Sequence, residues 1–162
     1  STGIHSNGFS LCRKVFNIDN NDPLLYEARE ELGGKTIAEA LLVPTKIYVK
    51  PVLALLEKVN VKGISHITGG GFYENIPRML PEGVRAVVKK DSYEVPAIFK
   101  LMAEKGQIAE EMMYNTYNMG IGMMLAVDAA DADKTVEALK AIGEDAFIVG
   151  SVEAGDKGVT LC

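Results

Sequence analysis

Apolar residues follow two different spacings along this chain, and segments with the two spacings alternate. Val52, Leu56 and Val59 lie three or four positions apart, which is typical of one face of an amphipathic helix. Residues 121–127 are almost continuously apolar, so we expect a central strand that is buried on both faces. The same criteria predict further helices over residues 7–17, 96–106, 108–117 and 131–142, and further strands over 64–68, 85–90, 147–152 and 159–161.

The order of these elements favours an α+β fold over a doubly wound parallel sheet, because helices and strands do not alternate strictly. Residues 121–152 have the pattern of a strand–helix–strand unit, which is typical of ferredoxin-like topology. The last two strands predict a closing hairpin around residues 155–158. Thr36 and Glu39 have the spacing of a capping box, which predicts a short helix that begins after Thr36.

Three consecutive glycines, Gly69 to Gly71, follow a short apolar stretch and precede a segment with helix-forming character. Glycine lets the backbone turn sharply and lets its N–H groups approach a ligand. A helix that begins there adds unpaired N–H groups and the positive end of its dipole. The pattern therefore predicts a site for phosphate or carboxylate, with a plain tight turn before a helix as the alternative.

A second segment of this kind opens the chain, where short polar residues and Gly8 precede an apolar-periodic stretch. Ser6 and Asn7 suit the start of a helix because their side chains accept hydrogen bonds from its first N–H groups. The two histidines of the chain, His5 and His66, lie beside these two segments. A histidine there can donate to an anion or move a proton near neutral pH, although a local hydrogen bond is the simpler role.

Composition limits the classes of function. A length of 162 residues with 48% hydrophobic residues fits one compact domain with its own core. The net charge of −5, without a basic block, argues against nucleic acid as a partner, and no apolar run is long enough to span a membrane. Cys12 and Cys162 show no zinc-type spacing with the histidines and nothing demands a disulfide, so we expect no metal site and a reduced, cytoplasmic setting.

Four motifs carry a family resemblance, and they occur in order at residues 5–11, 42–48, 66–78 and 118–123. Together they closely resemble aminoimidazole ribonucleotide synthetase, also called phosphoribosylformylglycinamidine cyclo-ligase, over residues 3–152. The enzyme of that family is longer and has an amino-terminal nucleotide-binding domain that is absent here. The resemblance therefore implies its carboxy-terminal domain alone, as a single domain over residues 1–162, with a three-layer α/β/α arrangement around a mixed sheet.

The resemblance implies a ligase of de novo purine biosynthesis that converts formylglycinamidine ribonucleotide to aminoimidazole ribonucleotide. ATP and Mg²⁺ are its expected cofactors, both bound mainly by the absent domain. This chain would supply the substrate side of the site and would be inactive alone. A homodimer is expected for the full-length enzyme, with neither nucleic acid nor a membrane as partner.

Under this interpretation His66 is the first candidate for proton handling or for polarising the amide oxygen of the substrate, and His5 is the second. Arg78 can bind an anion bidentately, although a surface salt bridge is an equal alternative. Asn75 is expected to hydrogen-bond back into the loop of glycines, whereas Asn118 matches the family in a segment where we favour a structural role. The residues expected to bind substrate or phosphate are Ser6, Asn7, Gly8, Thr68, Gly69, Gly70, Gly71, Asn75 and Arg78.

Two other functions stay open at this point. One is a different ATP-using enzyme of the same architecture, similar to selenophosphate synthetase, thiamine monophosphate kinase or a hydrogenase-maturation protein. Against it, the motifs at residues 5–10 and 66–78 match the cyclo-ligase better. The other is a non-catalytic module that binds phosphate metabolites or a partner protein.

Overall fold

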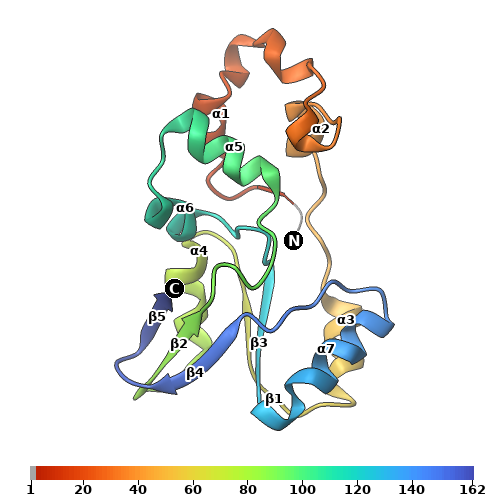
Figure 1. The fold of residues 1–162 in the computed structure, drawn as a ribbon, viewed down its shortest axis with the longest axis vertical. Coiled ribbons are helices and arrows are strands. Elements are labelled where there is room, and N and C mark those ends of the chain that lie inside the picture. Colours follow the sequence, from red (N-terminus) through yellow and green to blue (C-terminus); the bar gives the residue numbers. More distant parts are fainter. Residues whose placement is uncertain (1–2) are drawn as a thin grey trace. The chain divides into compact units, whose positions relative to one another are not determined.

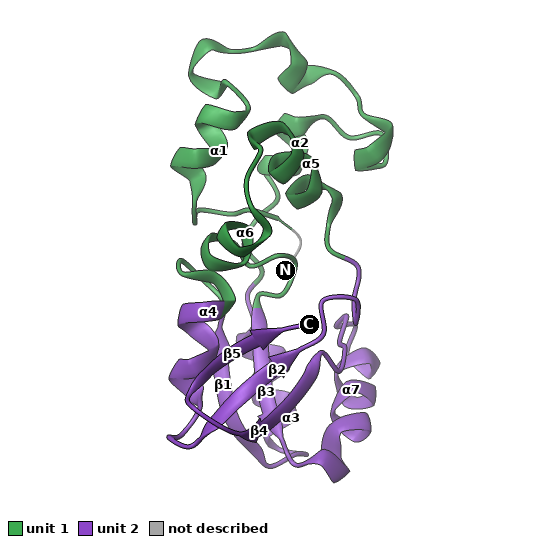
Figure 2. Ribbon diagram, turned by 60° about the vertical axis from the view of Figure 1, so that its left-hand side comes forward, with its two compact units in different colours: residues 1–46, 67–72, 95–122 green, residues 47–66, 73–94, 123–162 purple. Residues whose placement is uncertain are grey.

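The computed structural model describes residues 3–162, and the chain divides into two compact units. Unit 1 consists of residues 1–46, 67–72 and 95–122, and unit 2 of residues 47–66, 73–94 and 123–162 (Figure 2). Each unit is thus assembled from three separate stretches of chain. The expectation of one domain over residues 1–162 stays a prediction.

Unit 1 is helical, and its main helices occur where the apolar periodicity predicted them (Figure 1). The capping box that was predicted for the shortest of these helices is present, because the Thr36 hydroxyl accepts from the Glu39 N–H at 3.1 Å and Glu39 accepts from the Thr36 N–H at 2.8 Å. Short 3-10 turns fill the polar stretch between the first two helices. The helices are α1 (Phe9–Val15), α2 (Ile37–Leu41), α5 (Ala97–Gly106) and α6 (Glu110–Thr116), and the 3-10 turns are Ile18–Asn20, Pro23–Tyr26 and Glu30–Leu32.

Aromatic side chains form the centre of the unit 1 core. Phe99 of α5 is fully buried, and its ring centroid lies 6.1 Å from that of Tyr117. Phe72 packs edge to face against Tyr114 at 5.1 Å. Cys12 of α1 is fully buried as well, so it belongs to this core. Burial raises the pKa of its thiol to about 12, so Cys12 is neutral at physiological pH.

Unit 2 contains all strands of the described residues, together with two helices that contact each other. The helices are α3 (Val49–Leu56) and α7 (Ala132–Ala141), and short 3-10 turns are formed by Ile76–Met79 and Ala129–Asp131. The short helix α4 (Gly71–Asn75) begins in unit 1 and ends in unit 2. The strands are β1 (Val61–His66), β2 (Val84–Val88), β3 (Met123–Val127), β4 (Gly150–Ala154) and β5 (Gly158–Leu161).

The strands form two sheets. β1 and β3 pair antiparallel, with His66 opposite Met123 at one end. β2 lies between β4 and β5, antiparallel to the first and parallel to the second, so this sheet is mixed. Helices together with antiparallel and mixed sheets confirm the predicted α+β class.

The prediction of a central, doubly buried strand at residues 121–127 is wrong. Within the described part of the chain β3 pairs with β1 alone, and of its five residues Met124 is buried while the others are partly exposed. β3 and β4 flank α7 but belong to different sheets, so the predicted strand–helix–strand unit does not close within one sheet. An apolar run of this length therefore predicts neither how deeply a strand is buried nor which strand is its partner.

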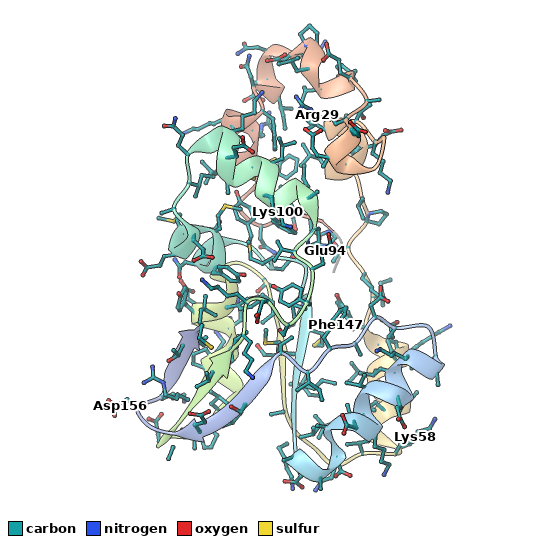
Figure 3. All side chains as sticks on the ribbon, in the orientation of Figure 1. Arg29, Lys58, Glu94, Lys100, Phe147 and Asp156 are labelled. Carbon is teal, nitrogen blue, oxygen red and sulfur yellow. The ribbon has the colours of Figure 1, made fainter. Side chains whose placement is uncertain are left out.

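The predicted closing hairpin is also wrong, because β4 and β5 do not pair with each other and β2 lies between them. Figure 3 shows Asp156 in the connection that joins the two strands. Two interstrand spacings amount to about 10 Å, which the three connecting residues can span when extended. β2 contains the buried Ala86 and Val88, so both edge strands pair with the strand that has more apolar surface to cover.

Candidate functional site

The glycine loop, residues 68–71, is a tight turn that follows β1. The Gly71 N–H donates to the Thr68 carbonyl at 3.1 Å, which closes the turn. Gly70, at the third position of this turn, has φ +89°, the backbone conformation that type II turns require and that glycine adopts without steric cost. The predicted sharp turn is therefore present at the predicted residues.

Gly71 is fixed by its surroundings. A Cβ atom at this position would lie 1.9 Å from the carbonyl oxygen of Tyr114, so no larger residue fits without a shift of the backbone. The glycine loop thus rests directly on the backbone of α6. The helix that follows, α4, has only five residues, and few aligned peptides give a weak dipole. The helix-dipole contribution expected from the sequence is correspondingly small, and any anion affinity depends on the loop itself and on the side chains beside it.

The amino-terminal loop, residues 3–8, carries the second group of predicted residues. His5 has φ +59°, a conformation that is uncommon for a residue with a side chain. Its Nδ1 lies 3.2 Å from the Val43 carbonyl, and because a carbonyl only accepts, Nδ1 carries the hydrogen in this contact. Partial burial lowers the pKa of the His5 imidazole below its usual value, against the opposing effect of this hydrogen bond. His5 is accordingly a neutral base near pH 7, with the lone pair on Nε2.

The two loops meet within unit 1. A Cβ atom placed on Gly69 would lie 3.3 Å from the Asn7 side-chain oxygen, so the Asn7 amide lies against the glycine loop. Ser6 is exposed and Asn7 is partly exposed. The structure therefore brings together two segments that are about sixty residues apart in the sequence and that the sequence selected independently as anion sites.

The connecting turn, residues 117–120, holds the amino-terminal loop at both ends. The Tyr117 hydroxyl donates to the Gly8 carbonyl at 2.9 Å, and the Asn118 side-chain N–H donates to the Gly3 carbonyl at 2.9 Å. Both side chains are buried. The sequence indicated no role for Tyr117, because an aromatic residue at helical spacing is typical of a core, and only the fourth family motif points to Asn118.

His66, the first catalytic candidate, is the last residue of β1 and is exposed. Its ring lies 6.1 Å from the ring of Tyr48, at an interplanar angle of 64°. Both residues belong to unit 2, whereas the two loops belong to unit 1. The role of His66 in proton handling stays a prediction.

Asn75 and Arg78 form a local cluster in unit 2. The Arg78 guanidinium donates to the Asn75 side-chain oxygen at 2.9 Å and lies 3.7 Å from the Glu74 carboxylate. Asn75 is buried, and its carbonyl accepts from the Ser65 hydroxyl at 2.8 Å. Arg78 therefore has the salt bridge that was the alternative to anion binding, while its exposure leaves a role toward an anion as a prediction.

The described residues offer no obvious metal-binding site. Over residues 3–162, no three His, Cys, Asp or Glu side chains gather into a group that could hold a metal ion. Across the same residues, no helix is both long and apolar enough to cross a membrane.

Comparison with known proteins shows which family this chain matches. The family model described as "AIR synthase related protein, C-terminal domain" matches residues 1–162. The phosphoribosylformylglycinamidine cyclo-ligase of Lachnospira eligens is 62% identical over 100% of this chain and 47% of its own length. The protein of the same name from Agathobacter rectalis is 60% identical over 99% of this chain and 47% of its own length. The chain thus spans about half the length of the curated relatives it matches.

A solved structure with a similar fold is that of the E. coli hydrogenase maturation protein HypE. It matches with a TM-score of 0.56 and 21% identity, over 72% of this chain and 36% of that protein. At this level of identity the similarity concerns the fold alone, and it agrees with the α+β architecture described above.

Proposed function

Because this chain belongs to the family of AIR synthase related proteins, we propose that it is the substrate-side, carboxy-terminal domain of an ATP-dependent ligase. The ligase converts formylglycinamidine ribonucleotide to aminoimidazole ribonucleotide in purine biosynthesis. The family and the cyclo-ligase name of the relatives support the reaction. The observation that supports the site is the approach of Asn7 to Gly69, since it joins the two loops that suit an anionic group.

The proposed reaction is a ring closure, and its difficulty is a poor leaving group. ATP transfers its terminal phosphoryl group to the oxygen of the formyl amide and leaves as ADP. The amidine nitrogen then uses its lone pair to form a bond to the same carbon, the bond from carbon to the phosphorylated oxygen breaks, and phosphate departs. The nitrogen loses one proton. Such chemistry depends mainly on positioning and charge stabilisation, which is what binding loops supply.

In this proposal the residues of the two loops bind and orient the substrate. Asn7, with Ser6 and the backbone of Gly8, meets a phosphate or ribose group from one side. The backbone and hydroxyl of Thr68 and the three glycines meet an anionic group from the other side. His5 is the proton acceptor that the unit 1 geometry favours, because its Nδ1 carries the hydrogen donated to Val43 and its Nε2 keeps the lone pair. His66, Asn75 and Arg78 keep their predicted roles.

The remaining parts of the proposal concern the whole enzyme. ATP and Mg²⁺ bind mainly to the amino-terminal half, and the full-length protein is a homodimer. This chain alone is inactive, since it has only the substrate side. The proposed setting is the cytoplasm, which agrees with the two free cysteines, Cys12 and Cys162.

Isothermal titration of this chain with formylglycinamidine ribonucleotide, with ATP–magnesium and with inorganic phosphate tests the proposal. We expect the substrate to bind, ATP to bind weakly or not at all, and no product to form. Asn7→Ala should weaken substrate binding about tenfold, since one hydrogen bond of about 1.4 kcal/mol is lost. The matched control is Asn60→Ala, which changes an exposed asparagine in unit 2 and should leave the affinity unchanged.

Three results would contradict the proposal. Product formation by this chain would mean that the catalytic groups lie within these 162 residues. Equal affinity for all phosphate compounds would favour a non-catalytic phosphate-binding module. An unchanged affinity in Asn7→Ala would remove the amino-terminal loop from the site.

A further inference from the structure

The amino-terminal loop contains the proposed proton acceptor His5 and the proposed binding residues Ser6 and Asn7, and its conformation is not one that the free chain favours. His5 has φ +59°, in the left-handed region that a residue with a side chain enters only at an energetic cost. Such a conformation persists only where the surrounding structure holds it. The contacts at the two ends of the loop therefore hold it in this conformation.

Tyr117 holds the distal end of the loop. Its hydroxyl donates to the Gly8 carbonyl at 2.9 Å, and its ring lies so close that a Cβ atom on Gly8 would come within 2.5 Å of a ring carbon. Tyr117 is fully buried, and burial raises the pKa of its hydroxyl, which therefore stays protonated and able to donate at physiological pH. The ring itself is anchored in the core beside Phe99.

Asn118 holds the proximal end. Its side-chain N–H donates to the Gly3 carbonyl at 2.9 Å, and its side-chain oxygen accepts from the Gly120 N–H at 2.8 Å. The backbone carbonyl of Asn118 also accepts from the Ile121 N–H at 2.8 Å, so the residue sits in a closed turn. Both ends of the amide group are thus engaged, and the side chain is only 5% exposed. A buried amide with both ends bonded has one orientation and little freedom.

The same stretch of chain also supports the glycine loop. The Tyr114 carbonyl touches Gly71, and the Tyr114 ring packs on Phe72 at 5.1 Å. Residues 114–120 therefore support both loops. Tyr114 contacts the glycine loop, and Tyr117, three residues later, contacts the amino-terminal loop. A shift of this support would change the distance between Asn7 and Gly69.

We propose that Tyr117 and Asn118 are positioning residues that hold residues 4–7 in the conformation that receives the substrate. This inference rests on the proposed function. Neither side chain touches the substrate; each acts through the backbone carbonyl that it binds. When a loop is competent to bind for only part of the time, the apparent affinity falls in proportion to that fraction. Loss of either hydrogen bond should therefore raise the Michaelis constant and change the turnover number much less.

Two near-isosteric substitutions test the hydrogen bonds without opening the core. Tyr117→Phe keeps the ring beside Phe99 and removes only the hydroxyl. Asn118→Asp keeps an acceptor for the Gly120 N–H and removes the donor to Gly3. The control is Tyr93→Phe, the same chemical change at a buried tyrosine of unit 2. We would measure the steady-state kinetics of the full-length protein with formylglycinamidine ribonucleotide. We would also measure the backbone order parameters of residues 4–8 in this chain without ligand.

If one lost hydrogen bond leaves about a tenth of the loops competent, KM rises about tenfold in both variants while kcat stays within about threefold. The order parameters of residues 4–8 should fall from the rigid value of about 0.85 toward 0.6, and Tyr93→Phe should change neither quantity. Wild-type order parameters in both variants would overturn the inference, and so would a loosened loop with an unchanged KM. Failure of the wild-type enzyme to use this substrate would instead overturn the proposed function, while the order parameters would still decide the role of the two residues.

Discussion

Two glycines with similar backbone angles have very different surroundings. Gly71 has φ +54° and Gly33 has φ +66°, so both lie in the left-handed region. A Cβ atom on Gly71 would meet the Tyr114 carbonyl at 1.9 Å, whereas a Cβ atom on Gly33 would meet nothing within 4 Å. The pair therefore separates the cost of the backbone angle from the cost of close packing.

We expect Gly71→Ala to destabilise the protein more than Gly33→Ala. The angle alone costs about 1 kcal/mol, which is the whole effect expected for Gly33→Ala. Overpacking against the α6 backbone adds roughly 1–3 kcal/mol in Gly71→Ala. Urea unfolding, with the slopes compared to exclude a change in the denatured state, measures the difference. Equal losses in the two variants would mean that Gly71 is not confined by Tyr114.

The residue scale also shows which candidate site residues a sequence can reveal. The glycine run stands out because conformational freedom is a property of the residue itself. The capping role predicted for Ser6 and Asn7 is wrong, since Gly8 is the N-cap of α1 and no side chain caps this helix. Tyr117 gives no such signal. A buried tyrosine is usually core, and only the contact between its hydroxyl and Gly8 distinguishes it.

At the scale of elements, α2 shows how local chemistry fixes a short helix. Five residues are too few for a helix to be stable on propensity alone, so its cap and its buried side chains Ile37 and Leu41 carry it. The reciprocal hydrogen bonds of Thr36 and Glu39 satisfy two N–H groups at its start. α2 ends just before Val43, whose carbonyl binds His5, so this helix also bears on the amino-terminal loop.

Removal of the cap should therefore be measurable. Thr36→Ala loses the side-chain acceptor and should lower the free energy of unfolding by about 1 kcal/mol. Thr36→Ser keeps the hydroxyl and should stay within about 0.5 kcal/mol of the wild type. Thermal or urea unfolding of both variants checks this, and a Thr36→Ala protein as stable as Thr36→Ser would show that the hydroxyl contributes nothing.

Strand pairing is the part of the element scale that the sequence did not reveal. The strands themselves lie near their predicted positions, because period and β-branched content are local properties. The pairing of the strands is not a local property, since β4 and β5 follow each other closely in the sequence and yet pair with opposite sides of β2. A short connection usually predicts a hairpin, but here both strands pair with β2, whose side chains Ala86 and Val88 are buried.

At the scale of the whole molecule, one buried thiol couples stability to pH. The Cys12 thiol has a pKa of about 12 in the folded protein, compared with an ordinary value of 9.0, because burial disfavours the thiolate. Because the pKa is raised, the contribution of the buried thiol to the free energy of unfolding is fully present below pH 9.0 and is lost as the pH rises toward 12. Above pH 9.0 the unfolded chain releases this proton and the folded protein does not.

We expect the wild type to lose stability relative to Cys12→Ala between pH 9 and 11, by roughly 1 kcal/mol per pH unit. Any cavity left by the substitution lowers the variant by an amount that does not depend on pH, and titrating groups that do not interact with Cys12 cancel in the difference. Burial is the larger cause that raises the pKa of Tyr117, and it acts in both proteins. Urea unfolding under reducing conditions at several pH values measures it. Parallel stability curves for the two proteins would contradict the burial of an un-ionised thiol.

The sequence by itself determined the α+β class, the positions of most helices, the glycine loop and the family, since periodicity, capping and motifs depend on neighbouring residues. Only the tertiary structure decided which strands pair and which side chains hold the amino-terminal loop. The hydrogen bonds from Asn118 to Gly3 and from Tyr117 to Gly8 join residues 115 and 109 positions apart. Such contacts depend on the path of the whole chain, because loop closure over these lengths is favourable only when burial elsewhere offsets its entropy cost.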